Sequence, residues 1–352
     1  MDRRRDSAPS TGLALAAAGA GAFLLARSLV RQRRWMDLEG KTALVTGGSR
    51  GFGLLLAREF ARQGANVVIC ARDEAELERA RKDLEGRGAS VAAIPCDVTD
   101  RSRVEQLISD AERRFGGIDV LVNNAGTISV GPMEVMTLDD YHEVMNIHFW
   151  GPLYTTMAAL PGMKSRGGGR IVNIASIGGK VPAPHLLPYT ASKFALVGFS
   201  EGLRAELKTD NVYVTTVCPG LIRTGSPRNA TFKGQHRAEY AWFSVSDSLP
   251  LTSMDAARGA RRVVLACQRG EAEVILSIQA KLAARFHGMF PGLSTELLSG
   301  VNSLLPGPGG IGTERAKGFE SESAISRSFL TAPSRRAAEE NNELAGDGAH
   351  TA

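Results

Sequence analysis

Short apolar runs rich in β-branched residues alternate with longer stretches of helical periodicity from Lys41 to about Ser277. Stretches such as Leu54–Gln63, Glu74–Leu84 and Arg101–Phe115 place apolar residues with the period of a helix. Near-continuous apolar strands joined by helices are typical of a parallel sheet covered on both faces, so we expect an α/β, doubly wound sheet of about seven strands. The strand-like runs are Thr42–Thr46, Asn66–Cys70, Val91–Pro95, Ile118–Asn123, Arg170–Ala175, Val212–Cys218 and Glu273–Leu276.

The pattern changes after Leu276, where apolar residues at helical spacing continue to Leu305 with a break at Pro291 and Gly292. We expect a pair of short amphipathic helices that closes over the site, lies against lipid or packs on the edge of the domain. The remaining chain is rich in Gly, Ser, Ala and charge, which favours disorder. The predicted segments are 1–36, basic-flanked and hydrophobic; 37–277, the sheet domain; 278–305, an amphipathic C-terminal extension; and 306–352, a mostly disordered tail.

The N-terminal segment contains fifteen residues without a polar side chain, Gly12–Ala26, between two groups of arginines. A full membrane span needs about 20 apolar residues, so this one spans only if neighbouring residues join it and Arg27 snorkels to the headgroups. A cleaved signal peptide, a disordered tail or an extra core helix are the alternatives. We expect an uncleaved, N-terminal hydrophobic helix that anchors the protein to a membrane.

Charge is concentrated in that same segment. Residues 1–36 contain seven arginines and two aspartates, which account for the whole net charge of +5. The neutral remainder argues against a partner nucleic acid. The four cysteines form no CxxC or Cys/His spacing, so we expect buried, reduced thiols and no metal site.

A glycine-rich turn, T-G-G-S-R-G-F-G from Thr46 to Gly53, follows the first strand and opens the first helix. Gly47 permits a tight turn, Gly51 lets the backbone approach a pyrophosphate, and Gly53 allows close packing of helix on strand. The helix then presents unpaired N–H groups to phosphates. In this strand–turn–helix position the motif indicates dinucleotide binding.

The end of the second strand distinguishes the two nicotinamide cofactors. An NAD site usually has an acid there for the ribose 2′-hydroxyl, whereas this chain has Ala-Arg, ending at Arg72. Arg72 and Arg50 can both reach a 2′-phosphate, which suits a guanidinium, so we expect NADP (NADPH). The alternative is a solvated Arg72 beside a helix capped by Asp73. Asp97 and Val98, past the third strand, are placed to bind adenine, with an ordinary turn aspartate as the alternative.

Tyr189 and Lys193 stand four residues apart at the start of a long helical pattern, so their side chains share one helix face. We expect the ammonium to favour phenolate and to lower the pKa of Tyr189 toward the operating pH. Ser176 ends the fifth strand, where its hydroxyl can stabilise charge on a substrate oxygen. Asn146 can hold a water that links Lys193 to solvent. These four residues are the candidate catalytic set.

The motifs occur in one order: the turn of Thr46–Gly53, an N-N-A-G run ending at Gly126, then Asn146, Ser176 and Y-x-x-x-K. Over about residues 39–277 the chain resembles the short form of the short-chain dehydrogenase/reductase family. The resemblance implies a Rossmann-type domain, contact of the Pro-Gly and Thr after the sixth strand with the nicotinamide carboxamide, and contact of the lysine with its ribose. The candidate cofactor-binding residues are Gly47, Ser49, Arg50, Gly51, Phe52, Gly53, Arg72, Asp97, Val98, Asn124, Ala125, Gly126, Tyr189, Lys193, Pro219, Gly220 and Thr224, with Phe52 bulkier than the family's usual Ile or Leu.

We therefore expect an NADP-dependent oxidoreductase that moves a hydride between nicotinamide and a carbonyl or alcohol. Tyr189 gives or takes the proton, Ser176 holds the oxygen, and Lys193 with Asn146 reloads the proton. The alternative is a membrane-tethered, NADP-binding scaffold or sensor with negligible turnover. The intact catalytic set speaks against that alternative.

Substrate choice is expected to lie in residues 127–136, 180–188 and 221–251, whose apolar side chains, such as Phe232, Trp242 and Phe243, suggest an apolar pocket. His185 is either a lid residue, which we favour, or a substrate contact. An anchor with an apolar pocket predicts a lipophilic, small-molecule partner: a fatty, sterol-like, retinoid-like or keto-sphingoid compound. We expect a membrane-associated protein whose catalytic domain faces the cytoplasm, where the cofactor is found, and which can form a homo-oligomer.

Overall fold

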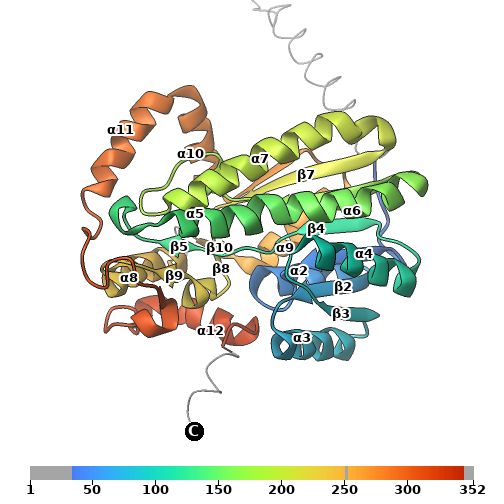
Figure 1. The fold of residues 1–352 in the computed structure, drawn as a ribbon, viewed down its shortest axis with the longest axis horizontal. Helices are drawn as coiled ribbons and strands as arrows, with labels where there is room; N and C mark the ends of the chain where they lie inside the picture. Colours follow the sequence, from blue (N-terminus) through green and yellow to red (C-terminus); the bar gives the residue numbers. More distant parts are fainter. Residues whose placement is uncertain (1–33, 250–252, 345–352) are drawn as a thin grey trace, which may run out of the picture.

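The computed structural model describes residues 34–249 and 253–344, which contain a central sheet of seven parallel strands (Figure 1). Their order is β11-β7-β6-β4-β1-β2-β3. The predicted α/β, doubly wound fold is confirmed, and a strand lies at each of the seven predicted runs. The strands are β1 (Thr42–Thr46), β2 (Asn66–Ala71), β3 (Val91–Pro95), β4 (Val120–Asn123), β6 (Gly169–Ile174), β7 (Val212–Pro219) and β11 (Glu273–Leu276).

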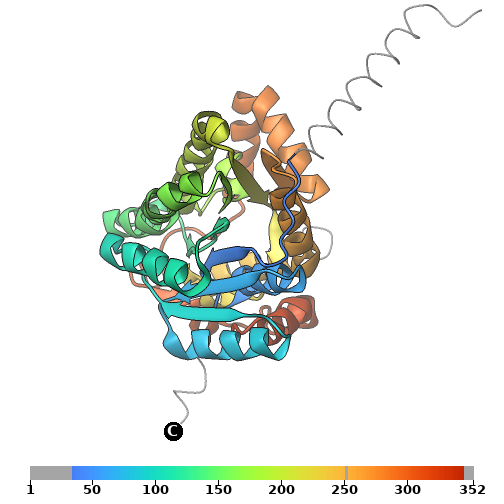
Figure 2. The ribbon, with the colours of Figure 1, turned by 90° about the vertical axis from the view of Figure 1, so that its right-hand side faces the viewer.

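Helices cover both faces of the sheet (Figure 2). Apolar side chains such as Phe60, Leu77 and Val263 form the core beneath α2, α3 and α9. Leu107 and Met163 belong to the second core, beneath α4, α6 and α7. Strands that are buried on both faces explain the near-continuous apolar runs. The helices are α2 (Gly51–Arg62), α3 (Glu74–Gly86), α9 (Ala256–Gln268), α4 (Arg101–Phe115), α6 (Gly151–Ser165) and α7 (Leu187–Leu207).

A buried polar network fixes α7 to the sheet. Asn173 of β6 donates through Nδ2 to Ser200 Oγ of α7 at 3.0 Å, and Thr216 of β7 donates to the same hydroxyl at 2.7 Å. Asn123 of β4 donates to Asn173 Oδ1 at 2.8 Å. Buried polar groups with partners specify one arrangement of the elements that carry them. The network therefore sets the position of the helix that carries Tyr189.

A cap lies beyond the sheet, built from β5 (Ser129–Val130), β9 (Thr231–Phe232), β12 (Ala316–Lys317) and α8 (His236–Ser248). Phe232 and Phe243 are buried in the core of this cap. The expectation that both side chains belong to an open apolar pocket is corrected, because they pack against each other at 6.0 Å between ring centroids. Trp242 is only partly buried beside them.

The amphipathic extension forms two helices, α10 (Ile278–Met289) and α11 (Pro291–Asn302), with the break at the predicted proline. Within these helices only Ala280 and Ser294 are buried. The alternative in which the helices pack their apolar stripe on the domain is therefore wrong. The large apolar side chains of this hairpin are exposed: Ile278, Leu282, Met289, Phe290, Leu293, Leu297 and Val301.

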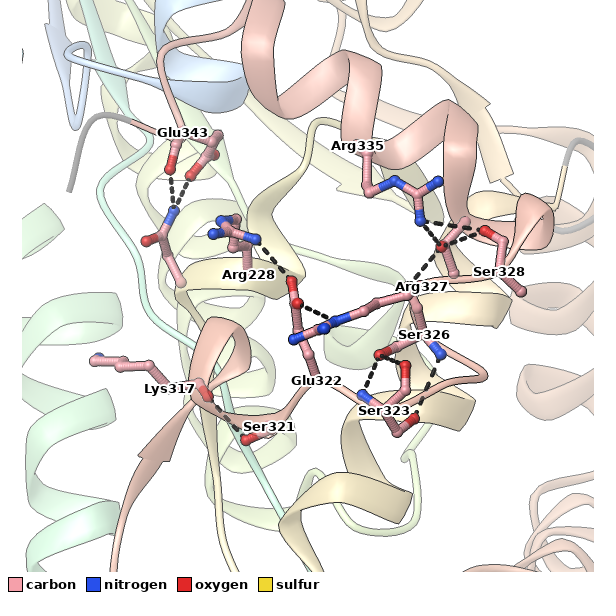
Figure 3. A network of polar contacts seen from close by, with 12 residues as sticks. Arg228, Lys317, Ser321, Glu322, Ser323, Ser326, Arg327, Ser328, Arg335 and Glu343 are labelled. Carbon is pink, nitrogen blue, oxygen red and sulfur yellow. Dashed lines mark hydrogen bonds and ion pairs between the residues drawn. The ribbon is translucent and has the colours of Figure 1, made fainter. Parts of the chain in front are cut away.

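The prediction of a mostly disordered tail is also wrong, because the described residues 306–344 are folded against the domain and include α12 (Ala332–Glu340). Polar contacts hold this tail where large apolar residues are missing (Figure 3). Glu322 accepts from Arg228 at 2.9 Å and from Arg327 at 2.8 Å. Ser334 of α12 donates to the buried Asp247 at 3.1 Å. The composition predicted disorder because the tail has few large apolar residues to bury. Hydrogen bonds, which composition does not reveal, hold it in place instead.

The predicted anchor, Gly12–Ala26, lies outside the described residues. Within residues 34–249 and 253–344, no helix combines the length and the apolar character needed to cross a membrane. The four cysteines all lie in the described part and are buried and free.

Candidate active site

The glycine turn connects β1 to α2 at the carboxyl edge of the sheet. Gly47 has φ +63°, and a Cβ there would lie 2.8 Å from Ala125 Cα. A Cβ on Gly53 would lie 2.0 Å from Gly47 O. The turn therefore accepts only glycine at these two positions, as the sequence predicted. Phe52 fits because it packs over another glycine, Gly259 of α9, whose added Cβ would lie 3.3 Å from the ring.

The end of β4 is tied to this turn. The amides of Asn124 and Ala125 both donate to Thr46 Oγ1, at 3.0 and 3.1 Å. The Asn124 side chain donates to the Thr46 and Gly47 carbonyls. A Cβ on Gly126 would lie 2.9 Å from His148 Nε2. The N-N-A-G run thus holds two strand ends together and leaves space beside them.

A cavity of about 370 Å³ opens beside β2 and β3. Arg72 and Asp97 line it, as expected for a nucleotide site, and so does Arg315 from the C-terminal tail. Asp97 also accepts from the Thr99 amide and hydroxyl, so it makes the ordinary turn contact as well. Asp73 caps α3 by accepting from the Glu76 amide, as the alternative for this stretch expected. Val98 is buried beneath the turn.

Ser176 and Tyr189 meet across a glycine. Ser176 follows β6 and accepts from the Gly178 amide at 3.0 Å. A Cβ on Gly178 would lie 3.3 Å from the Tyr189 ring and 3.5 Å from Ser176 Oγ. Ser176 lies close enough to Tyr189 to lower the pKa of its phenol. The hydroxyl and the phenol therefore face one small space, as the candidate catalytic set requires.

Lys193 lies one turn further along α7, with Nζ 5.5 Å from the centre of the Tyr189 ring. It donates to Ile174 O at 3.0 Å. Burial lowers the pKa of Lys193 to about 7. Burial also raises the pKa of Tyr189 above its usual value, against the lowering effect of Ser176. The expectation of a lowered tyrosine pKa is therefore corrected, because desolvation by burial raises the pKa by more than Ser176 lowers it.

The loop after the sixth strand runs from β7 through β8 (Leu221–Arg223), which pairs with β10 (Ser253–Asp255). Pro219 ends β7, and a Cβ on Gly220 would lie 3.0 Å from Ser277 Oγ. Thr224 is buried and accepts from the Ser226 amide at 3.2 Å. These three residues line up along the carboxyl end of β7, beside the strand that leads to Ser176.

Comparisons with known proteins agree with this geometry. Residues 41–233 match the family described as short chain dehydrogenase. The chain belongs to the short-chain dehydrogenase/reductase family. It is 36% identical over 259 residues to dehydrogenase/reductase SDR family protein 7-like of Anopheles gambiae, covering 72% of this chain and 80% of that protein. It is 38% identical over 215 residues to 3-ketodihydrosphingosine reductase of Mus musculus, covering 59% and 65%.

Two solved structures of this family share the fold. A short chain dehydrogenase/reductase from Burkholderia phymatum in complex with NAD has a TM-score of 0.68 and 25% identity, covering 73% of this chain and 96% of that one. L-Sorbose reductase from Gluconobacter frateurii, complexed with NADPH and L-sorbose, has a TM-score of 0.62 and 28% identity, covering 69% and 97%. As a short-chain dehydrogenase, this protein is an oxidoreductase of alcohol or carbonyl groups with a nicotinamide cofactor.

The residues present fit such a dinucleotide. The turn excludes side chains where a pyrophosphate approaches, and α2 begins there, so the N-terminus of a helix faces the same place. Ser49 and Arg50 both contact Glu76, at 3.0 and 2.7 Å, which holds the Arg50 guanidinium beside the turn. The cavity lined by Arg72 and Asp97 follows the next two strands of the sheet, β2 and β3. These positions would hold the phosphates and the adenosine.

Asn146 begins a π-helical turn, Asn146–Trp150, that follows α5 (Leu138–Met145). Single π turns are frequent at functional sites. Its side chain is exposed and lines the cavity with Arg72 and Asp97. Its role in a water link to Lys193 stays a prediction.

His148 is a residue of the site that the sequence did not single out. Its Nε2 accepts from the Thr127 amide at 3.1 Å, so Nδ1 carries the proton and donates to Ser192 Oγ at 2.8 Å. The imidazole also meets the Tyr189 ring edge-on, 5.4 Å between centroids. His148 therefore positions the tyrosine and the end of β4. Only its place two residues after Asn146 could have signalled it.

His185 is buried, and its Nδ1 lies 2.7 Å from Glu239 of α8. Glu239 also accepts from Trp242 at 2.7 Å. These contacts join the loop before α7 to the cap. They fit the interpretation of His185 as a lid residue better than that of a substrate contact.

Proposed function

We propose that this short-chain dehydrogenase is an NADP-dependent reductase of a lipophilic carbonyl compound, associated with a membrane. The observation that carries the proposal is the meeting of Ser176, Tyr189 and Lys193 at the carboxyl edge of the sheet, beside the glycine turn. Binding and proton-transfer groups are brought together there by elements far apart in sequence.

Tyr189 is the acid of the proposed reaction. Because burial raises its pKa, the phenol is protonated at neutral pH and can donate that proton to a carbonyl oxygen. A bound nicotinamide supplies the hydride. Ser176, which lies beside Tyr189, holds the substrate oxygen as its charge develops.

Lys193 returns the proton. A pKa of about 7 lets its ammonium give up and take back a proton near neutral pH. Because its Nζ lies over the Tyr189 ring, the phenolate formed in the reaction has a cation beside it. Tyr189 therefore donates the proton to the substrate, and Lys193 replaces it.

Preference for NADP is supported by a group of cations. Arg50, Arg72 and Arg315 together depress the pKa of Lys317, whose largest cause of lowering is burial. Carboxylates already pair with two of them, Glu76 with Arg50, and Asp140 and Glu143 with Arg315. A 2′-phosphate would bind beside Arg72, which lines the cavity with Arg315, and guanidinium groups bind a phosphate in two-point contacts. Arg315 and Lys317 come from the tail, outside the match to the family.

Membrane association and a lipophilic substrate are supported by the exposed face of α10 and α11. Contiguous exposed apolar side chains mark a contact surface, and the hairpin carries Lys281 and Arg285 beside them. Interfacial helices combine these two features. The relative from Mus musculus is described as 3-ketodihydrosphingosine reductase. We propose that the hairpin and the N-terminal segment hold the catalytic domain at a membrane, on its cytoplasmic side.

The test is a panel of carbonyl compounds assayed with NADPH and NADH side by side. We expect turnover of long-chain, sterol-like, retinoid-like or keto-sphingoid ketones and a preference for NADPH. Arg72→Ala should raise the KM for NADPH roughly tenfold and leave the KM for NADH unchanged, because it removes a charged hydrogen bond. Arg87→Ala, which breaks an exposed contact to Asp83, is the control.

Activity confined to small sugars or ketoacids would contradict the lipophilic substrate. Faster turnover with NADH would contradict the cofactor preference. Binding of NADPH without turnover of any compound would favour the scaffold over the enzyme.

A further inference from the structure

The end of the described chain lies on the glycine turn. We call residues Asn341–Glu343 the C-terminal strap. The Gly51 amide, the first of α2, donates to Asn341 O at 2.9 Å. The Asn342 side chain donates to Ser49 O at 2.8 Å and to Glu76 O at 3.1 Å. The strap therefore uses an N–H group that begins the helix, together with two carbonyls beside it.

Glu343 places a carboxylate over the same turn. Its side chain is 3% exposed and lies 3.5 Å from Arg50 Nε. It also accepts from the Asn229 side chain, a contact drawn in Figure 3. A Cβ on Gly51 would collide with its Oε1. The carboxylate thus fills the space that the absent side chain of Gly51 leaves open.

A folded helix, not a loose end, holds the strap in this place. Ala338 of α12 packs so closely on Gly225 that a Cβ there would collide with it. Arg58 of α2 donates to Glu340 O at 3.1 Å and to Asn341 Oδ1 at 3.2 Å. The strap is therefore positioned from both sides, by the cap and by α2.

A carbonyl oxygen on a helix N–H and a carboxylate beside an arginine are the contacts that a phosphate makes. We propose that the C-terminal strap is an autoinhibitory element that competes with the dinucleotide phosphates for the glycine turn. The inference rests on the proposed function in one respect, the binding of a nicotinamide dinucleotide at this turn. The inference adds that the C-terminal strap must leave the glycine turn before the dinucleotide can bind there.

Competition follows from charge and from hydrogen-bond capacity. Gly51 has one N–H, which Asn341 O occupies. Burial raises the pKa of Glu343 to about 7, so at neutral pH part of the molecules carry a carboxylate there, which would repel a phosphate at the same arginine. A cofactor that binds only the released form has an apparent affinity reduced by the fraction of molecules in that form. Weakening the strap therefore tightens cofactor binding without touching a residue that contacts the cofactor.

Hydrogen exchange of the full chain, with and without NADPH, tests the inference. We expect NADPH to speed amide exchange in peptides covering residues 332–344 and to leave the glycine turn protected, because the phosphates replace the strap there. Slower or unchanged exchange in residues 332–344 would overturn the proposal, since the tail would then close on the cofactor or ignore it.

Asn342→Gly is the variant to pair with this measurement. Asn342 has φ 60°, so glycine keeps the backbone and only the side-chain contacts are lost. We expect the Kd for NADPH to fall roughly tenfold, because three hydrogen bonds of the strap disappear: those to Ser49 O and Glu76 O and the one from Arg79. Asn211→Gly is the matched control, because Asn211 has φ 58° and donates to Gly167 O, away from the turn. It should leave the Kd unchanged.

The outcomes separate the inference from the proposed function. Tight NADPH binding with equal Kd values for Asn342→Gly, Asn211→Gly and the natural chain overturns the strap and leaves the function intact. Binding that appears only in Asn342→Gly supports both. NADPH binding by none of the three overturns both.

Discussion

Lys193 lies over the face of the Tyr189 ring, with Nζ 5.5 Å from its centre; the lysine is buried and the tyrosine is partly buried. Burial lowers the pKa of the lysine to about 7 and raises that of the tyrosine. The protonated phenol of Tyr189 therefore lies beside the Lys193 ammonium, which can exchange its proton near neutral pH. Burial of the Lys193 amine also means that its charged form destabilises the folded state.

Lys193→Met should therefore abolish turnover and yet raise stability. The unfolded chain keeps the lysine proton up to a pKa of 10.5, whereas the folded chain gives it up near 7. The buried lysine therefore lowers the free energy of unfolding of the natural chain. This loss is close to its full size at pH 7 and shrinks as the pH rises toward 10.5. Chemical unfolding at pH 7 and pH 10 measures the gain, which should be larger at pH 7. An equal gain at both values would show that the amine is not desolvated.

His148→Gln tests the positioning of Tyr189 from the other side. Burial lowers the pKa of His148 well below its usual value, so the unfolded chain takes up a proton below about pH 6.5 that the folded chain refuses. The natural chain should lose up to about 1.4 kcal/mol of stability per pH unit through this residue as pH falls, and the variant should not. Its kcat should also fall, with KM for NADPH unchanged.

The control for that series is His287→Gln on α10, which changes a histidine that does not line the cavity of Arg72 and Asp97. It should keep both the acid slope and the kcat of the natural chain. If it and His148→Gln behave alike, His148 has no special part in the site.

Gly179→Ala tests the fit between the Ser176 loop and α7. A Cβ there would lie 2.6 Å from Lys193 O and 2.8 Å from Val197 Cγ2. We expect a loss of about 1–3 kcal/mol in the free energy of unfolding, together with a lower kcat, as the helix is pushed away. Gly198→Ala, on the same helix with nothing within 4 Å of the new Cβ, should instead gain about 0.5–1 kcal/mol. Denaturant unfolding of the two variants compares them directly.

The exposed hairpin of α10 and α11 predicts how the protein meets lipid. Leu282 and Leu297 are 61% and 57% exposed, so changing both to Ser should not disturb the core. We expect the double variant of the full chain to bind vesicles of anionic lipid more weakly and to turn over vesicle-borne substrate more slowly. Leu138→Ser, at a residue 76% exposed on α5, is the control. Equal flotation of all three proteins would contradict a lipid role for the hairpin.

The sheet was predictable because its strands are buried on both faces and therefore carry unbroken apolar runs. α4 matches its predicted bounds at both ends. Its limits are set locally, by Asp100 accepting from the amides of the first turn and by Gly116 in the left-handed conformation. The candidate site could likewise be identified without tertiary contacts, because the glycine turn, Ser176, Tyr189 and Lys193 follow one another in a recognisable order along the chain.

What the sequence did not predict depends on neighbours in space. Helical spacing placed Lys193 beside Tyr189 but carried no information on how far the fold removes water, so the predicted pKa shift had the wrong sign. Arg315 lines the cavity beside Arg72, and Lys317 lies close enough to both for their charges to lower its pKa; both come from a tail that is held largely by hydrogen bonds. His148 acts through its partners, and only the fold brings Ser192 and Thr127 to it.

The central claim is that Tyr189 donates the proton to a carbonyl while hydride is transferred to its carbon. Tyr189→Phe removes the hydroxyl and keeps the ring that packs against His148 and Lys193. With the preferred ketone and NADPH, single-turnover oxidation of NADPH should slow by roughly 100-fold or more, as expected for the loss of a general acid. The Kd for NADPH should stay within about twofold, a change of less than 0.5 kcal/mol. Equal single-turnover rates in the variant and the natural chain would contradict the account.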